Sequence, residues 1–152
     1  MKFEVKITKM RQLVLKSGKY LFFFLVVLLI NPSCDKIDSQ VPDVPFSFTI
    51  NLNITNELTS PGNSVFFPGA GFGGVIVYCE LPGTYYAYDA TCTYEISQTC
   101  KLVNEGVLAT CGCCESKFIL IGTAYPSDGP AAAPLKQYHI SMINSTMIRV
   151  YN

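Results

Sequence analysis

Hydrophobic and polar positions alternate along much of the chain after residue 45. The alternation is strict over nine positions at 46–54, which predicts a half-buried β-strand whose core-facing residues are Phe46, Phe48, Ile50, Leu52 and Ile54. Shorter apolar runs bounded by Gly, Pro and Asn predict further strands at 65–67, 75–78, 84–89, 101–110 as a hairpin, 117–122, 138–143 and 146–151. Because no long helical period follows residue 34, we expect an all-β fold.

The first 33 residues follow a different pattern. Residues 2–19 carry six basic side chains, residues 20–30 are an unbroken apolar run, and Cys34 directly follows Ser33. The apolar run is shorter than the roughly twenty residues that a membrane-spanning helix needs. The pattern is typical of a bacterial lipoprotein signal, so we expect residues 1–33 to be removed and Cys34 to be lipidated. The alternative is a membrane anchor that stays on the protein.

The expected mature chain has one tether and one domain. Residues 34–45 are polar and contain Pro42 and Pro45, which predicts an extended tether to a domain at 46–152. Without residues 1–33, ten acidic and five basic residues are left, so no basic patch is available for nucleic acid. We therefore expect an exported protein of the bacterial cell envelope, at the periplasmic or the surface face, whose lipid binds a membrane.

Five of the seven cysteines lie close together in the second half of the chain, at positions 92, 100, 111, 113 and 114. Four of them belong to two short clusters, 92–94 and 111–116, and Cys100 lies between the clusters. A Gly- and Pro-rich loop follows at 127–135. Two short cysteine loops can close over one metal centre. Exported proteins also favour disulfides, so the same cysteines can be oxidised in pairs.

This layout resembles the Rieske iron–sulfur domain over about residues 70–150. In that family one loop reads Cys-x-His and the other Cys-x-x-His, and the two Cys hold one iron while the two His hold the other. Matches to the second loop, the following strand and the covering loop are Cys111, Cys113, Ser116, Phe118, 129–131, Pro134, Leu135 and Tyr138. The resemblance implies Rieske-like antiparallel sheets with a small inserted cluster-binding subdomain, whose cluster-type loops span 89–138. It also implies electron transfer with a protein partner.

Both histidine positions of the family pattern hold other residues, namely Tyr94 and Cys114, and the single histidine, His139, matches no ligand position. The resemblance therefore implies a cofactor site made of Cys92, Tyr94, Cys111 and Cys114. Its three cysteines would bind the metal, and Tyr94 or Cys100 would be the fourth ligand. The resemblance further implies a disulfide between Cys100 and Cys113.

Three arrangements of the cysteines are open at this point. In the first they bind a [2Fe–2S] cluster or zinc, since all-cysteine ligation suits both. In the second the metal is absent, and disulfides pin the loops of a clusterless module that binds a partner in the envelope. In the third the adjacent Cys113 and Cys114 exchange disulfides with nearby thiols. No catalytic constellation is complete in the sequence, so the sequence does not decide whether the protein is an enzyme, and the role it indicates is at most that of an electron-transfer component.

Overall fold

The computed structural model describes residues 39–152, which form ten strands and one 3-10 turn, η1 (Asn56–Thr59). The expected all-β architecture is confirmed. The predicted signal at 1–33 and the predicted lipidation site Cys34 lie outside the described residues. From residue 39 onward, no helix has both the length and the apolar character to cross a membrane.

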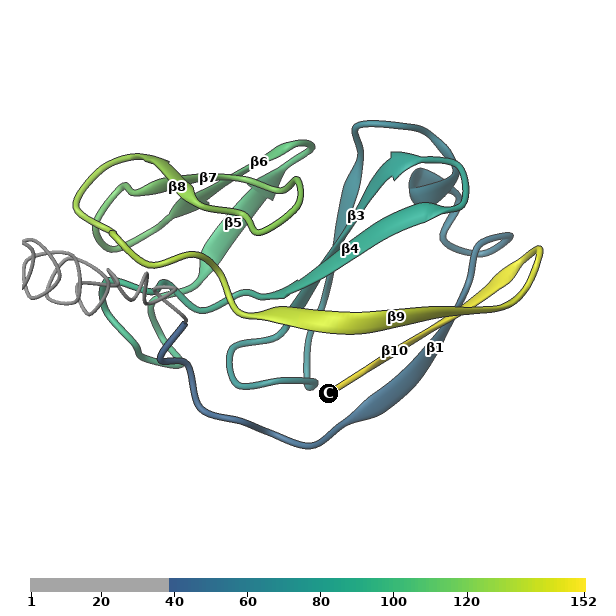
Figure 1. The fold of residues 1–152 in the computed structure, drawn as a ribbon, viewed down its shortest axis with the longest axis horizontal. Coiled ribbons are helices and arrows are strands. Elements are labelled where there is room, and N and C mark those ends of the chain that lie inside the picture. Colours follow the sequence, from purple (N-terminus) through teal and green to yellow (C-terminus); the bar gives the residue numbers. More distant parts are fainter. Residues whose placement is uncertain (1–38) are drawn as a thin grey trace, which may run out of the picture. The chain divides into compact units, whose positions relative to one another are not determined.

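Six strands form the larger antiparallel sheet, in the order β1-β10-β9-β4-β3-β2 (Figure 1). They are β1 (Ser47–Asn51), β2 (Ser64–Phe67), β3 (Val75–Leu81), β4 (Thr84–Asp89), β9 (Gln137–Asn144) and β10 (Met147–Tyr151). Strand β9 joins the two halves of this sheet. Its first residues pair with β4, where Tyr138 lies opposite Ala87, and its later residues pair with β10.

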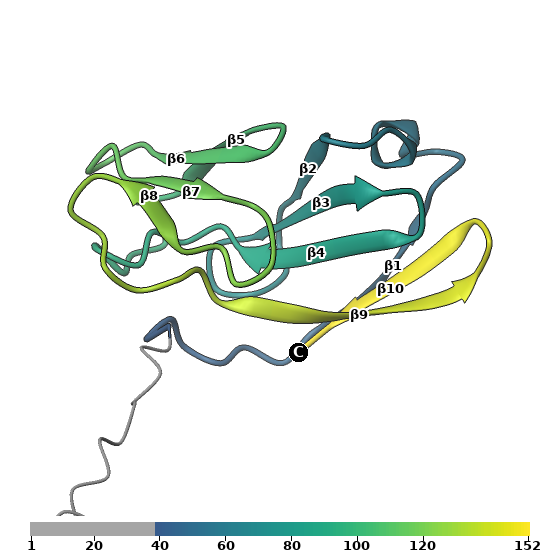
Figure 2. The ribbon, with the colours of Figure 1, turned by 45° about the horizontal axis from the view of Figure 1, so that its top comes forward.

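Four strands form a smaller antiparallel sheet that is inserted between β4 and β9. They are β5 (Leu102–Glu105), β6 (Leu108–Cys111), β7 (Lys117–Ile119) and β8 (Pro126–Asp128), paired in chain order. Figure 2 shows this sheet to one side of β3 and β4. The expected inserted subdomain is therefore present, and all five clustered cysteines lie within the insertion.

Strand β3 is buried on both faces, which explains its unbroken apolar sequence. Val75, Val77 and Cys79 face a core inside the larger sheet, which also includes Ile148 and Val150. Ile76 and Tyr78 face the opposite way, into a second core shared with the inserted subdomain. Other members of that second core are Tyr88, Cys92, Cys100, Leu102, Cys111, Phe118 and Leu120. The cysteine region therefore packs directly on the back of the central strands.

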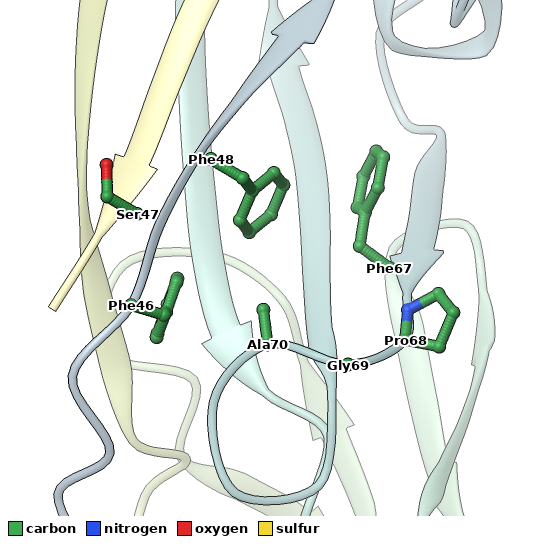
Figure 3. Close-up of a pocket in the computed structure, with 7 residues that line it drawn as sticks. All are labelled: Phe46, Ser47, Phe48, Phe67, Pro68, Gly69 and Ala70. Atoms are coloured by element: carbon green, nitrogen blue, oxygen red, sulfur yellow. The ribbon is translucent and has the colours of Figure 1, made fainter.

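The two outermost strands of the larger sheet, β1 and β2, come close without pairing. The rings of Phe48 and Phe67 lie 5.4 Å apart. Figure 3 shows these two rings and Phe46 around an apolar groove of about 320 Å³. Aromatic side chains, rather than backbone hydrogen bonds, therefore close the gap between the two ends of the sheet.

Several element boundaries differ from the sequence-based predictions. Strand β1 ends at Asn51, because the Asn51 carbonyl accepts hydrogen bonds from the amides of Ile54 and Thr55 and turns the chain. Ile54, expected in the core, is 80% exposed. Strand β7 ends at Ile119, whose carbonyl accepts the amide of Ile121 at 2.8 Å. Strand β8 (Pro126–Asp128) overlaps the start of the Gly- and Pro-rich segment 127–135, which was expected to be a loop throughout.

Part of the segment predicted as a tether packs against the domain. Val41 is only 4% exposed. The ammonium group of Lys136 donates to the Val41 carbonyl at 3.2 Å and forms an ion pair with Asp43. The chain is therefore held to the domain several residues before β1 begins.

Candidate metal centre

Three free cysteines converge at one end of the inserted subdomain. Cys92 follows β4, Cys111 ends β6, and Cys114 lies in the turn after β6. Their sulfur atoms all lie within 4.8 Å of one another, and those of Cys92 and Cys114 are 3.4 Å apart. Cys92 and Cys111 are buried, whereas Cys114 is half-buried. The structure therefore brings together the three cysteines that the sequence analysis named as metal ligands.

The loop that carries Cys92 is fastened to the loop that carries Cys111 and Cys114. The amide of Cys92 donates to the Cys100 carbonyl at 3.1 Å, and the amide of Gly112 donates to the Lys101 carbonyl at 3.2 Å. A disulfide joins Cys100 to Cys113, with the two Cα atoms 5.6 Å apart. This disulfide links the two loops beside the three free thiols and holds their relative positions.

The Gly- and Pro-rich loop is attached to both cysteine loops. The Thr93 hydroxyl donates to the Ala133 carbonyl at 2.8 Å. The Ala131 amide donates to the hydroxyl oxygen of the buried Ser116 at 3.0 Å. Because Ser116 accepts this bond, its own hydrogen is free to be donated to the sulfur of Cys114, 3.1 Å away. Ser116 was a motif match in the sequence, but its contact with Cys114 depends on the fold.

The protein environment acts differently on two of the three thiols. Burial raises the pKa of Cys92 to about 12, and the contact with Cys111 adds to this shift. Burial acts to raise the pKa of Cys114, but the hydrogen bonds from the Ser116 side chain and backbone, together with the contacts with Cys92 and Cys111, outweigh it, so the pKa is lowered. Cys114 is therefore the thiol that the site favours as a thiolate.

A buried carboxylate positions the first cysteine loop. Asp89, at the end of β4, is fully buried. It accepts hydrogen bonds from the amides of Phe72, Gly73 and Thr91 and from the Tyr138 hydroxyl. These bonds fix the end of β4 three residues before Cys92. The sequence analysis did not predict this role. The position of Asp89, at the end of a predicted strand and three residues before Cys92, could have indicated it.

The structure excludes one of the two expected fourth ligands. Cys100 is oxidised in the disulfide with Cys113, so its sulfur cannot bind a metal, and the expectation that Cys100 could be the fourth ligand is wrong. The Tyr94 side chain is 59% exposed. Among the His, Cys, Asp and Glu side chains of residues 39–152, no fourth one joins the three cysteines.

The donor set fits a metal centre but does not fit a complete [2Fe–2S] site. Such a cluster takes four protein ligands, two on each iron. The described residues bring three sulfurs within 4.8 Å of one another, one fewer than such a cluster needs. A metal–sulfur bond of about 2.3 Å in a tetrahedral site places its sulfurs roughly 3.8 Å apart. The spacing of the three cysteines is therefore compatible with one metal ion.

No family model matches this chain, and no curated protein matches it. Among solved structures, its fold is similar to the ferredoxin of carbazole 1,9a-dioxygenase from Nocardioides aromaticivorans IC177, with a TM-score of 0.46 and 19% identity over 71% of this chain and 97% of that chain. A chain from the complex of reduced oxygenase and oxidized ferredoxin in carbazole 1,9a-dioxygenase has a TM-score of 0.49 and 19% identity, over 69% and 92% of the two chains. The Sphingomonas yanoikuyae B1 ferredoxin has a TM-score of 0.43 and 18% identity, over 61% and 88%.

Proposed function

We propose that this protein is a Rieske-like metal-binding domain of the bacterial cell envelope, and that Cys92, Cys111 and Cys114 hold the metal. The observation that carries the proposal is the convergence of three free thiols from two loops, all within 4.8 Å of one another. Thiolates are ligands for soft metal ions and for iron–sulfur centres. Three of them in one place are poorly explained as ordinary core residues, because the core could use aliphatic side chains instead.

Electron transfer to a protein partner is the activity that the Rieske resemblance implies, and the proposal includes it for a redox-active metal. The names of the structurally similar ferredoxins agree with such a role. Tyr94 and Ile96, which follow Cys92 along the chain, are exposed and available to contact such a partner. The activity therefore depends on which metal the three cysteines select.

A second candidate is a clusterless binding module of the envelope. One observation favours it: the disulfide between Cys100 and Cys113 already links the two cysteine loops without a metal. Because the sulfurs of Cys92 and Cys114 are 3.4 Å apart, thiol–disulfide exchange with an external disulfide would also join them in a second disulfide, the external disulfide being reduced to two thiols.

Metal analysis of the full chain separates the two candidates. The protein is purified anaerobically from membranes, its metals and acid-labile sulfide are measured, and its free thiols are counted after unfolding. Bound metal that is lost in Cys111→Ser supports the metal-binding domain. Metal well below stoichiometric, with Cys92 and Cys114 joined in a disulfide, rejects it in favour of the binding module.

Export and anchoring are part of the proposal. They rest on the basic and apolar pattern of residues 1–33 and on the position of Cys34. An intramolecular disulfide agrees with an oxidising compartment outside the cytoplasm.

A further inference from the structure

We infer that the three-cysteine group binds a single thiophilic metal ion with one coordination position left to an external ligand, rather than a two-iron cluster. This inference rests on the proposed metal-binding function and specifies the kind of centre. It follows from three observations: the spacing of the sulfurs, the hydrogen-bond donors around them, and the lack of a fourth His, Cys, Asp or Glu side chain beside them in residues 39–152.

The spacing of the sulfurs suits one ion. The sulfurs of Cys92 and Cys114 are 3.4 Å apart, and the whole group lies within 4.8 Å. The measured distance is close to, and the upper limit of 4.8 Å allows, the roughly 3.8 Å expected between sulfurs on one tetrahedral ion. In a two-iron cluster, ligands of different irons sit at opposite ends of the core. Cys114, which replaces the histidine of the second iron, instead lies against Cys92.

Hydrogen-bond donors reach every sulfur of the group. The amides of Tyr94 and Glu95 face the Cys92 sulfur, and the amide of Cys113 donates to the Cys111 sulfur at 3.4 Å. The Cys114 sulfur is contacted by the Ser116 hydroxyl at 3.1 Å. Such donors stabilise sulfur that carries negative charge, and they orient metal ligands from the next shell of residues. Neutral thiols in a core would gain much less from them.

The fourth position has no candidate among the His, Cys, Asp and Glu side chains of residues 39–152. Cys100, the nearest alternative by sequence, is committed to the disulfide with Cys113. The half-buried Cys114 marks the side of the group that solvent can reach. A water molecule or a small external thiol would therefore complete a tetrahedral site, as in metal sites that keep one position open.

The chemistry of the ligands selects soft ions. Three thiolates favour Zn²⁺, Cu⁺ or Fe²⁺ over hard ions such as Mg²⁺ and Ca²⁺. Binding releases the protons of the three thiols, since each cysteine coordinates as a thiolate. No change in oxidation state is needed, and the disulfide between Cys100 and Cys113 stays intact during binding. The three ions share the same ligand set, and metal analysis of the isolated protein distinguishes them.

The test uses the full chain, purified anaerobically without reductant so that the disulfide is retained. Titration with Co²⁺ should give thiolate-to-cobalt absorption that saturates at one ion per chain, and Zn²⁺ should displace the cobalt. Cys114→Ser should abolish saturable binding, and Ser116→Ala should weaken binding about tenfold. Cys79→Ala is the matched control, since Cys79 is a free cysteine in the other core and its loss should leave the stoichiometry unchanged.

Reconstitution with iron and sulfide tests whether the site holds a two-iron cluster instead of a single ion. Two irons and two sulfides per chain, bound through these cysteines, would overturn the single-ion inference while leaving the proposed metal-binding function intact. No saturable binding of Co²⁺, Zn²⁺ or iron would overturn both. Cobalt binding that Cys114→Ser leaves unchanged would also overturn the inference, because the site would then lie elsewhere.

Discussion

The hydroxyl of Tyr138 donates a hydrogen bond of 2.6 Å to the fully buried carboxylate of Asp89, which joins β9 to β4. The same carboxylate accepts the amides of Gly73 and Thr91. One side chain thus ties the end of β4, the loop before β3 and the start of β9 together. Because Cys92 follows a few residues later, this contact is also part of what positions the cysteine group.

Replacing Tyr138 by Phe should destabilise the domain. The ring would still pack in the core, but Asp89 would lose one donor while staying buried. The expected cost is about 1–3 kcal/mol in the free energy of unfolding. Urea denaturation at pH 7 measures it, with Tyr94→Phe as the matched control because that hydroxyl belongs to a side chain that is 59% exposed. Equal stability of Tyr138→Phe and the wild type would show that the hydrogen bond between Tyr138 and Asp89 does not stabilise the domain.

Alkaline pH should reveal the same contact. Burial, followed by the hydrogen bond and the charge of Asp89, raises the pKa of Tyr138 above its usual value near 10. The stability that depends on the neutral phenol is therefore complete below pH 10 and falls as the pH rises further. One such group contributes a slope of at most about 1.4 kcal/mol per pH unit. The slope measured for Tyr138→Phe should be smaller than that of the wild type.

Removing the disulfide should loosen both cysteine loops. The double variant Cys100→Ser/Cys113→Ser should lose about 2–5 kcal/mol of stability, the usual cost in a small exported domain. Thermal unfolding of wild type and variant without reductant measures the difference, and the wild type treated with reductant should resemble the variant. Peptide mapping under non-reducing conditions must find Cys100 and Cys113 in one linked pair. A pairing of Cys113 with Cys79 would contradict the structure.

A methyl group at position 73 should disturb the start of the first cysteine loop. A Cβ atom on Gly73 would overlap the buried Thr91 hydroxyl and approach the Thr91 amide to 3.1 Å. Overpacking of this kind costs about 1–3 kcal/mol. Gly112→Ala is the control, because its new atom would meet only the Lys101 carbonyl at an ordinary 3.6 Å. We expect a lower melting temperature for Gly73→Ala than for Gly112→Ala, and similar values would argue that the loop gives way easily.

The anchor is tested by mass. We expect the membrane fraction to contain a chain that begins at Cys34 and carries acyl groups, and Cys34→Ser should release the protein or leave the signal uncleaved. Intact-mass measurement distinguishes these forms. A mature chain that still begins at Met1, or that begins beyond Cys34, is incompatible with this proposal.

The sequence predicted the strands well where a local pattern decided them. The hairpin at 138–151 turns at Asn144 and Ser145 as expected, because its residues alternate and its turn is polar. Ile54 was placed in the core because the alternation continues to it. However, the amides of Asn53, Ile54 and Thr55 are all taken up by Asn51, and such a turn leaves no trace in the hydrophobic pattern.

The sequence could predict which cysteines form the candidate site, but it could not predict which type of metal centre they form. Cys92, Cys111 and Cys114 could be grouped from the sequence because they lie in two short cysteine loops, which the structure places after β4 and after β6. The family pattern implied the disulfide between Cys100 and Cys113, which makes Cys100 unavailable as a ligand. It gave no warning that the sulfur of Cys114 lies against that of Cys92, because this contact depends on how the two loops meet in three dimensions.

The gap between β1 and β2 makes the larger sheet an almost closed cylinder with a seam. Along the rest of its circumference neighbouring strands are joined by backbone hydrogen bonds, but β1 and β2 do not pair and meet through side chains, as in the contact of the Phe48 and Phe67 rings. Slow fluctuations of the domain should therefore begin there, and amide hydrogen exchange should be faster in β1 and β2 than in β3 and β4. The cysteine group packs on the outer face of β3 and β4. Opening between β1 and β2 should therefore leave the strands that support the cysteine group in place.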